Sequence, residues 1–215
     1  MANGIVVPKG ICSTRIMKAK SARGEETRLR MIRAAQDLFH KQGVRATSPD
    51  QIIEASRTGK GQFYHYFGSK EGLVHEVLRA QLDAIKTGAT PLEYKIRSWE
   101  DLERWFIGHI EQQKSFNMSR GCPFGTIANE LGEGDELLRL DLSLIFEMIR
   151  HHVVVFFGGE KSAGRLCPAA DPEQMGDFCV AAIQGAMMMG KVKRDSKPAE
   201  AAVREALAHL KRYAI

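Results

Sequence analysis

The sequence predicts an all-α protein of about nine helices. Apolar residues recur three or four positions apart in most segments, capping residues precede several of them, and none shows the alternation of a half-buried strand. The chain has 215 residues, of which 44% are hydrophobic and 7% aromatic, so it can bury a sizeable core. We expect three parts: a flexible basic arm over residues 1–25, a small helical domain over residues 26–72 and a larger helical domain over residues 73–215.

Residues 1–25 are basic and show no helical or strand period. They contain Lys9, Arg15, Lys18, Lys20 and Arg23 but only one acidic residue. The simpler interpretation is a frayed terminus without a role. A basic arm could also lie along phosphates or in a minor groove, so its deletion should be tested against DNA affinity.

The small domain begins with an amphipathic segment. Met31, Ile32, Ala35, Leu38 and Phe39 form an apolar stripe at helical spacing. This pattern predicts a first helix that ends shortly before Gly43.

A second helix is expected to begin at about Pro49. Ser48 can cap it, Pro49 has no N–H to leave unpaired, and Gln51 completes a capping box. Residues 57–59 then interrupt the pattern, because Gly59 tolerates backbone angles that other residues resist. The break is short enough to be a turn between two packed helices.

A third helix is predicted from about Lys60 to Tyr66. Phe63 and Phe67 share one of its faces, which can pack on a core. The residues largely off that face are basic, polar or aromatic: Lys60, Gln62, Tyr64 and His65. This outer face is free to meet a partner.

The charge of the chain is concentrated in the same region. Residues 1–72 hold 13 Lys or Arg against 6 acidic residues, whereas residues 73–215 hold 18 against 20. Ser69 is expected to cap a fourth helix, and Lys70 follows at its positive N-terminus, where an acidic residue would stabilise the helix dipole. A phosphate near this point would explain the lysine.

The stretch from Thr27 to Leu82 resembles the DNA-binding domain of the TetR family (TetR/AcrR-type) of bacterial transcriptional regulators. The family pattern occurs here as LFHKQG, TSPDQI, KGQFYHYF and GSKEGL, in that order. Two residues depart from it: Arg57 stands where the turn usually has Gly, and Gly59 stands where the third helix usually has a Ser cap. The resemblance implies a helix-turn-helix DNA-binding domain, a homodimer that binds a palindromic operator in double-stranded DNA, and a small-molecule effector.

The resemblance and the residue chemistry together predict the DNA contacts. These are Thr47, Ser48, Lys60, Gly61, Gln62, Tyr64, His65 and Lys70. Hydroxyl, imidazole and ammonium groups at positions 47, 64, 65 and 70 suit phosphates, which fix the register. Lys60 and Gln62 suit guanine and adenine edges, and Gly61 lets the helix approach the groove. The alternative for Tyr64 and His65 is an ordinary aromatic cluster.

The larger domain is read as further helices separated by glycine-containing breaks. After the fourth helix and a loop over residues 87–97, we expect helices from about Trp99 to Phe116 and from Cys122 to Leu131. A long apolar helix should then run from Asp135 to Phe157, ended by a Gly pair at 158–159. Two helices follow, opened by Asp171-Pro172 and by Pro198.

The last two helices are rich in small residues and methionine, which suits close helix packing. The resemblance implies a dimer interface there, and the alternative is packing against the long helix of the same chain. An effector pocket between helices could be lined by Trp105, Phe106, His109, Phe124, Met148, His152 and Phe178. The alternative for each of these residues is plain core.

Cys122 is a candidate redox or electrophile sensor, because Arg120 and a helix N-terminus would lower its thiol pKa. A small buried residue at a helix start is the alternative. A cysteine-dependent enzyme with Cys122 as nucleophile is a rival of another class, but no matching signature accompanies it. A nonspecific DNA-binding protein is a second rival, which a competitor titration would separate from a regulator.

The cysteines and the apolar pattern bear on compartment and cofactors. No apolar run in the first 25 residues exceeds residues 4–7, and no segment approaches the ~20 apolar residues of a membrane span. Four cysteines show no metal-ligand spacing. We therefore expect a cytoplasmic regulator that is not an enzyme, with reduced thiols and with no metal, cofactor or membrane partner.

Overall fold

The computed structural model describes residues 21–215, which form nine α-helices and one isolated β-bridge between Leu166 and Ala214. The helices are α1 (Ala22–Gln42), α2 (Pro49–Ser56), α3 (Lys60–Phe67), α4 (Lys70–Thr87), α5 (Trp99–Ser115), α6 (Pro123–Ala128), α7 (Glu136–Ser162), α8 (Pro172–Lys193) and α9 (Lys197–Lys211). The all-α prediction is confirmed. The predicted arm over residues 1–25 lies almost wholly outside the described residues.

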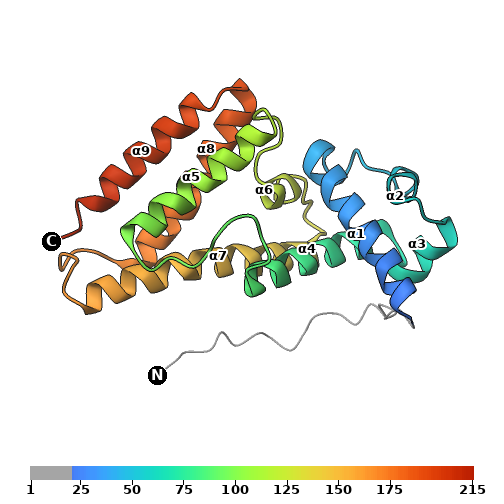
Figure 1. The fold of residues 1–215 in the computed structure, drawn as a ribbon, viewed down its shortest axis with the longest axis horizontal. Coiled ribbons are helices and arrows are strands. Elements are labelled where there is room, and N and C mark those ends of the chain that lie inside the picture. The colour runs from blue at the N-terminus through green and yellow to red at the C-terminus, as the bar shows by residue number, and fades with distance from the viewer. Residues whose placement is uncertain (1–20) are drawn as a thin grey trace.

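Helices α1–α3 gather at one end of an elongated molecule, and α8 and α9 lie at the other end (Figure 1). We call α1–α3 and the first turns of α4 the head. Its core consists of fully or nearly fully buried side chains: Met31, Phe39, Ile52, Phe63, Phe67, Leu73 and Leu78. These residues belong to the apolar faces expected from the sequence, so the amphipathic pattern correctly indicates which faces of the head helices are buried.

The local start signals of the head helices act as predicted. The Ser48 hydroxyl accepts a hydrogen bond from Gln51 N at 3.2 Å, and Gln51 Oε1 accepts one from Ser48 N at 2.8 Å. This pair is the capping box. Ser69 likewise caps α4 by accepting a hydrogen bond from Gly72 N.

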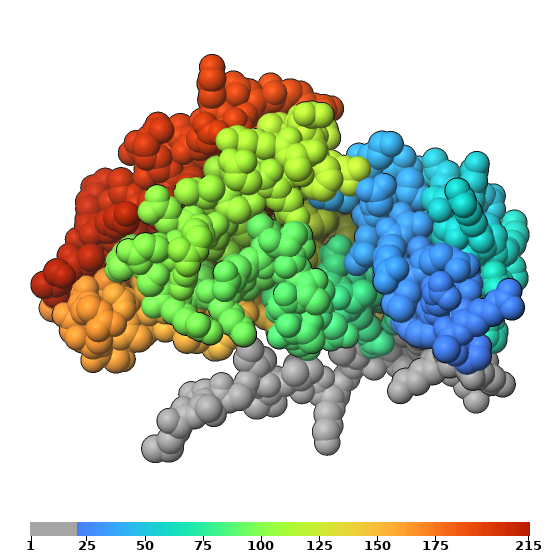
Figure 2. All heavy atoms as spheres, viewed as in Figure 1, coloured from blue at the N-terminus to red at the C-terminus, as the bar shows by residue number. Residues whose placement is uncertain are grey.

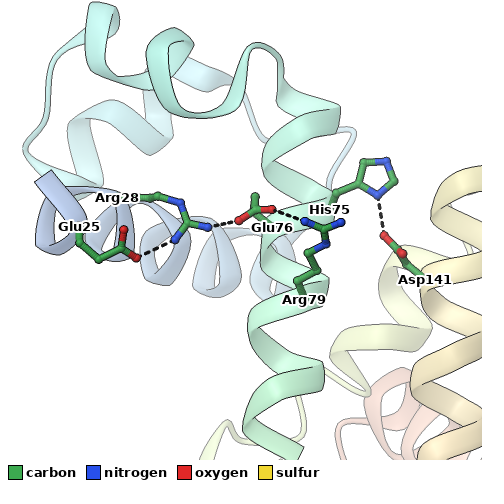
Figure 3. Close-up of polar contacts among 6 residues, drawn as sticks. All are labelled: Glu25, Arg28, His75, Glu76, Arg79 and Asp141. Carbon is green, nitrogen blue, oxygen red and sulfur yellow. Dashed lines mark hydrogen bonds and ion pairs between the residues drawn. The ribbon is translucent and has the colours of Figure 1, made fainter. Parts of the chain in front are cut away.

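Helix α4 connects the head to the rest of the chain and carries charged contacts in both directions (Figure 3). Glu76 is buried, with 4% of its surface exposed, and pairs with Arg28 of α1 and with Arg79 at 3.4 Å. At the preceding residue of α4, His75 Nδ1 lies 2.6 Å from the Asp141 carboxylate of α7. Because α4 runs unbroken from residue 70 to 87, the sequence boundary at 72/73 falls inside a rigid helix.

Helix α8 packs closely against both α7 and α9. A Cβ at Gly176 would lie 2.5 Å from the Val154 side chain of α7, and one at Gly190 would overlap the Met118 side chain. These two glycines therefore serve packing within the chain. The face of α8 that points away from these contacts exposes Phe178, Met188, Met189 and Val192.

The end of α7 differs from the prediction. The helix continues through Gly158 and Gly159 to Ser162, although each glycine weakens a helix by roughly 1 kcal/mol relative to alanine. Two packed groups hold this last turn: Phe157 is fully buried against Trp99, and Glu160 is buried and pairs with Arg165. Helix α6 also ends earlier than predicted, at Ala128.

Candidate functional site

The turn between α2 and α3 has the geometry of a helix-turn-helix, with one strained residue. Arg57 caps α2 in the left-handed region, with φ 51° and ψ 52°, which glycine would occupy at lower cost. Thr58 N donates to Ile53 O, and the Ser56 and Thr58 hydroxyls lie 2.7 Å apart. These bonds offset the strain and fix the angle between α2 and α3.

Helix α3 divides into a buried face and an exposed face. Phe63, Tyr66 and Phe67 are buried, whereas Tyr64 is 47% exposed. The other residues of the exposed face are Lys60, Gly61, Gln62 and His65. We call these five residues, 60–62 with 64 and 65, the α3 surface.

Two groups of the α3 surface make weak or exchangeable contacts. The Lys60 ammonium lies 3.9 Å from the Asp50 carboxylate, and both side chains are at least 70% exposed, so water screens this pair. Gln62 Oε1 accepts a hydrogen bond from Gly59 N at 3.0 Å, which is one half of a capping box; the other half is missing because Gly59 has no side chain. Both side chains can rearrange toward a groove at low cost.

The residues flanking the α3 surface have different environments. Ser48 is exposed beside it, but Thr47 is 1% exposed, and its hydroxyl donates to Gly43 O at 2.6 Å. In this conformation the Thr47 side chain does not reach a phosphate, so we no longer assign it a DNA contact. Lys70 Nζ donates to Val44 O at 3.1 Å and to Thr47 O at 3.2 Å, and its third N–H is left for another acceptor.

A cavity of about 470 Å³ lies where the head meets the larger domain. Its walls come from α1 (Arg33, Gln36, Asp37, His40), α4 (Gln81, Ala84, Ile85), the loop after α4 (Ala89, Thr90, Pro91, Leu92, Tyr94), α5 (Trp105, His109, Gln112), the segment from Phe116 through Arg120 to α6 (Cys122, Pro123, Phe124), α7 (Ile149) and α8 (Val180, Ile183, Gln184, Met187). Its size is typical of small-molecule sites.

Three of the seven residues predicted to line a pocket do so: Trp105, His109 and Phe124. The other four do not line it. Phe106 is fully buried in the core, Phe178 is 38% exposed on the outer side of α8, and Met148 and His152 are half-buried on α7. The lining residues that the sequence did not reveal include Asp37 and His40 of α1 and Tyr94 of the loop. Nothing local marks the polar face of α1 as anything other than a solvated face.

Burial keeps two titratable groups of the cavity lining, His109 and Tyr94, neutral near pH 7. Burial lowers the pKa of His109 to about 4, against a smaller opposing effect of its hydrogen bond to Trp105 O at 2.7 Å. Burial also raises the pKa of the Tyr94 phenol. Among the described residues, Trp105 Nε1 and Gln81 Oε1 are buried and have no hydrogen-bond partner, and both residues line the cavity.

Beside the cavity, the head is joined to the segment before α6. His40 Nε2 of α1 lies 2.7 Å from Gly121 O and donates to it, and Arg120 pairs with Asp37 at 2.6 Å. We call these two contacts the domain contact. Figure 2 shows the yellow-green segment after α5 touching the blue surface of α1. Because Asp37, His40 and Arg120 also line the cavity, a molecule inside it would touch both domains.

Cys122 lies in the cavity wall, but its environment differs from the prediction. Burial raises its thiol pKa and outweighs the N–H of Gly125, whose nitrogen lies 3.4 Å from Sγ. The Arg120 guanidinium, expected to favour a thiolate, pairs with Asp37 and lies 4.3 Å from the centre of the Phe116 ring. The expected lowering of the thiol pKa is therefore wrong, because both effects were judged from sequence neighbours alone.

Two features of residues 21–215 bear on the possible chemistry. No three His, Cys, Asp or Glu side chains there lie close enough together to hold a metal ion. None of the helices in this part of the chain combines the length and the apolar character needed to cross a bilayer.

Comparison with known proteins adds an independent view of both domains. Residues 31–77 match the family pattern described as "Bacterial regulatory proteins, tetR family", and residues 102–206 match "Tetracyclin repressor-like, C-terminal domain". The "HTH-type transcriptional repressor DhaR" of a Mycobacterium species is 26% identical over 174 residues, covering 80% of this chain and 85% of that protein. The "Uncharacterized HTH-type transcriptional regulator TtgW" of Pseudomonas putida is 31% identical over 99 residues, covering 45% of this chain and 74% of that protein.

The fold itself recurs in solved structures. A TetR transcriptional regulator from Chloroflexus aurantiacus superposes with a TM-score of 0.77, covering 90% of this chain and 98% of the other at 19% identity. At this identity the likeness concerns the arrangement of helices.

Proposed function

Because this chain belongs to the TetR family of helix-turn-helix transcriptional regulators, we propose that it is a repressor that binds a palindromic operator as a homodimer and leaves it when a small molecule fills the cavity. The observation that carries the proposal is that the head contributes both the α3 surface and a wall of the cavity. The α3 surface is exposed at one end of the head, and the cavity touches the same head through α1.

The α3 surface supports a division of labour on DNA. Lys60 and Gln62 are proposed to read guanine and adenine edges, because they are exposed at the first turn of α3. Gly61 lets that turn approach the groove, since no Cβ stands between backbone and bases. Phosphate contacts are assigned to Ser48, Tyr64, His65 and the free N–H of Lys70.

The exposed face of α8 supports the homodimer. Phe178, Met188, Met189 and Val192 are large apolar side chains left in contact with solvent in the single chain. Gly185 lies on this helix with open space beside it, which allows a second helix to approach closely. A two-fold dimer would hold two α3 surfaces ~34 to 36 Å apart or a multiple of that distance, so we expect an imperfect palindrome as the operator.

The domain contact supports the proposed release. The bonds of His40 and Asp37 to the segment before α6 fix the tilt of the head against the cavity wall. A ligand that prefers a different separation of these walls would shift the population toward heads that no longer fit both half-sites. The loss of DNA affinity then equals the ligand's differential affinity for the two states.

Selection of bound duplexes from a random library tests the DNA half of the proposal. We expect one enriched imperfect palindrome for the natural sequence and a changed base preference for Gln62→Ala. Lys86→Ala, which removes an exposed lysine at the far end of α4, is the matched control and should select the same palindrome. Enrichment of no sequence would refute specific operator binding and favour a nonspecific DNA-binding protein.

A further inference from the structure

We propose that the cavity takes an uncharged, mostly apolar molecule of about bicyclic size or larger that accepts a hydrogen bond from the Trp105 indole and donates one to the Gln81 amide oxygen. The inference rests on the proposed function for its effect on DNA, but binding itself can be measured without DNA.

The two unpaired polar atoms carry the argument. Trp105 is 2% exposed, and its Nε1–H finds no acceptor among the described residues; Gln81 Oε1 is buried and finds no donor. A buried polar group without a partner is destabilising, so a ligand that supplies the partner binds more tightly than one that does not. Trp105 of α5 and Gln81 of α4 both belong to the lining of one cavity, so a ligand that brings an acceptor to the first and a donor to the second satisfies both atoms.

The rest of the cavity determines the body of the ligand. Phe124, Ile149, Ile183 and Met187 line it and offer no hydrogen bonds through their side chains. The cavity volume of about 470 Å³ accommodates a bicyclic molecule. Aromatic walls favour a flat ring on the ligand, because a pair of aromatic rings is stabilised by more than the apolar area that it buries.

The charges around the cavity exclude an ionised group in its interior. The Asp37 and Arg120 charges compensate each other at 2.6 Å, and Arg33 is exposed at the rim. The inner residues Tyr94 and His109 are neutral near pH 7, since burial disfavours their charged forms and holds the pKa of His109 at about 4. A buried carboxylate or ammonium would lose its hydration without gaining a counter-ion.

The position of Gln81 gives the hydrogen bond a regulatory consequence. Gln81 lies on α4, six residues after His75, whose ring contacts Asp141 of α7, and five after Glu76, which pairs with Arg28 of the head. A ligand held between Gln81 and Trp105 would therefore tie α4 to α5. It would act on the helix that joins the head to the larger domain.

A matched set of bicyclic probes tests the inference on the full chain without DNA. The probes are indane, with no polar group; 1-indanone, with an acceptor; 1-indanol, with a donor and an acceptor; and 1-indanecarboxylate, with a charge. Dissociation constants are measured at about pH 7.5 by ligand-observed NMR titration, with protein variants Trp105→Phe and Gln81→Met. Trp99→Phe is the control, because Trp99 is the other tryptophan of α5 and packs on Phe156 and Phe157 outside the cavity.

We expect 1-indanone to bind at least about three-fold more tightly than indane, and 1-indanol to bind more tightly than 1-indanone. Trp105→Phe should abolish the preference for 1-indanone over indane. Gln81→Met should abolish only the higher affinity of 1-indanol relative to 1-indanone. Trp99→Phe should leave both affinity ratios unchanged.

Three results would overturn the assigned ligand class: equal affinities for indane and 1-indanone, tightest binding of the carboxylate, or no binding of any probe at millimolar concentration. If 1-indanol binds as expected and leaves DNA affinity unchanged at saturation, the ligand class stands and the proposed release from DNA fails.

Discussion

The buried His109 should make the protein lose stability as the pH falls, by an amount that its environment determines. The side chain is 6% exposed and donates to Trp105 O, and its pKa falls from 6.5 to about 4 on folding. Between these two values the unfolded chain binds a proton at His109 that the folded chain does not. The free energy of unfolding is therefore highest above pH 6.5 and decreases as the pH falls through this window.

The size of the effect follows from the two pKa values. The full loss below the folded pKa is about 3 kcal/mol, and the part between about pH 7.5 and about pH 5 is about 2 kcal/mol. Burial also lowers the pKa of His40 and His152, so these residues add losses of the same sign. A variant at position 109 is needed to separate the contribution of His109 to the pH-dependent loss of stability from those of the other two histidines.

Urea unfolding of His109→Asn provides that measurement, at one fixed protomer concentration. The Asn side-chain amide can donate from the position of Nδ1 but does not titrate, so the variant should lose about 2 kcal/mol less than the natural sequence between about pH 7.5 and about pH 5. His65→Asn, at an exposed position of α3, is the control and should leave the pH dependence unchanged. Identical pH dependences for His109→Asn and the natural sequence would refute the reasoning.

Three further perturbations test the head and its contacts. Glu76→Ala should lower the free energy of unfolding by about 3 kcal/mol because it leaves Arg28 without its buried partner, whereas Glu25→Ala, which removes a more exposed partner of the same arginine, should cost less than about 1 kcal/mol in the same urea assay. Gly43→Ala should cost about 2 kcal/mol in thermal or urea unfolding, because φ 88° and ψ 166° belong to a region that is essentially confined to glycine. Lys70→Ala should weaken binding to all duplexes alike and reduce the slope of log affinity against log salt by about 0.9 for each protomer on DNA, measured by anisotropy.

Each of these predictions has a contradicting outcome. Equal losses of unfolding free energy for Glu76→Ala and Glu25→Ala would mean that the buried Arg28–Glu76 pair stabilises the fold no more than the more exposed Arg28–Glu25 pair. A Gly43→Ala variant of natural stability would show that the backbone at this position can relax. A Lys70→Ala variant with an unchanged salt slope would restrict Lys70 to its two bonds with Val44 O and Thr47 O.

The features that could be predicted from the sequence are those whose causes are local. The Ser48–Gln51 capping box, the Ser69 cap and the two faces of α3 depend on residues within one or two turns, and the structure has all of them. The extent of α7 could not be predicted, because Phe157 holds its last turn by packing on the distant Trp99 of α5.

The features that the sequence did not reveal depend on tertiary neighbours. The wall that α1 contributes to the cavity arises only when the head packs on the segment before α6. The same packing engages Arg120 with Asp37, and desolvation of the Cys122 thiol raises its pKa, the reverse of the direction expected from adjacent residues. Thr47, which was expected to contact a phosphate, is instead buried, and its hydroxyl donates locally to Gly43 O.

The most direct test of the account compares the affinity for the selected palindrome with that for a scrambled duplex of the same composition, by anisotropy at one fixed salt concentration. We expect the palindrome to bind at least about a thousand-fold more tightly and Gln62→Ala to remove much of this ratio. Equal affinities for the two duplexes would contradict sequence-specific reading by the α3 surface.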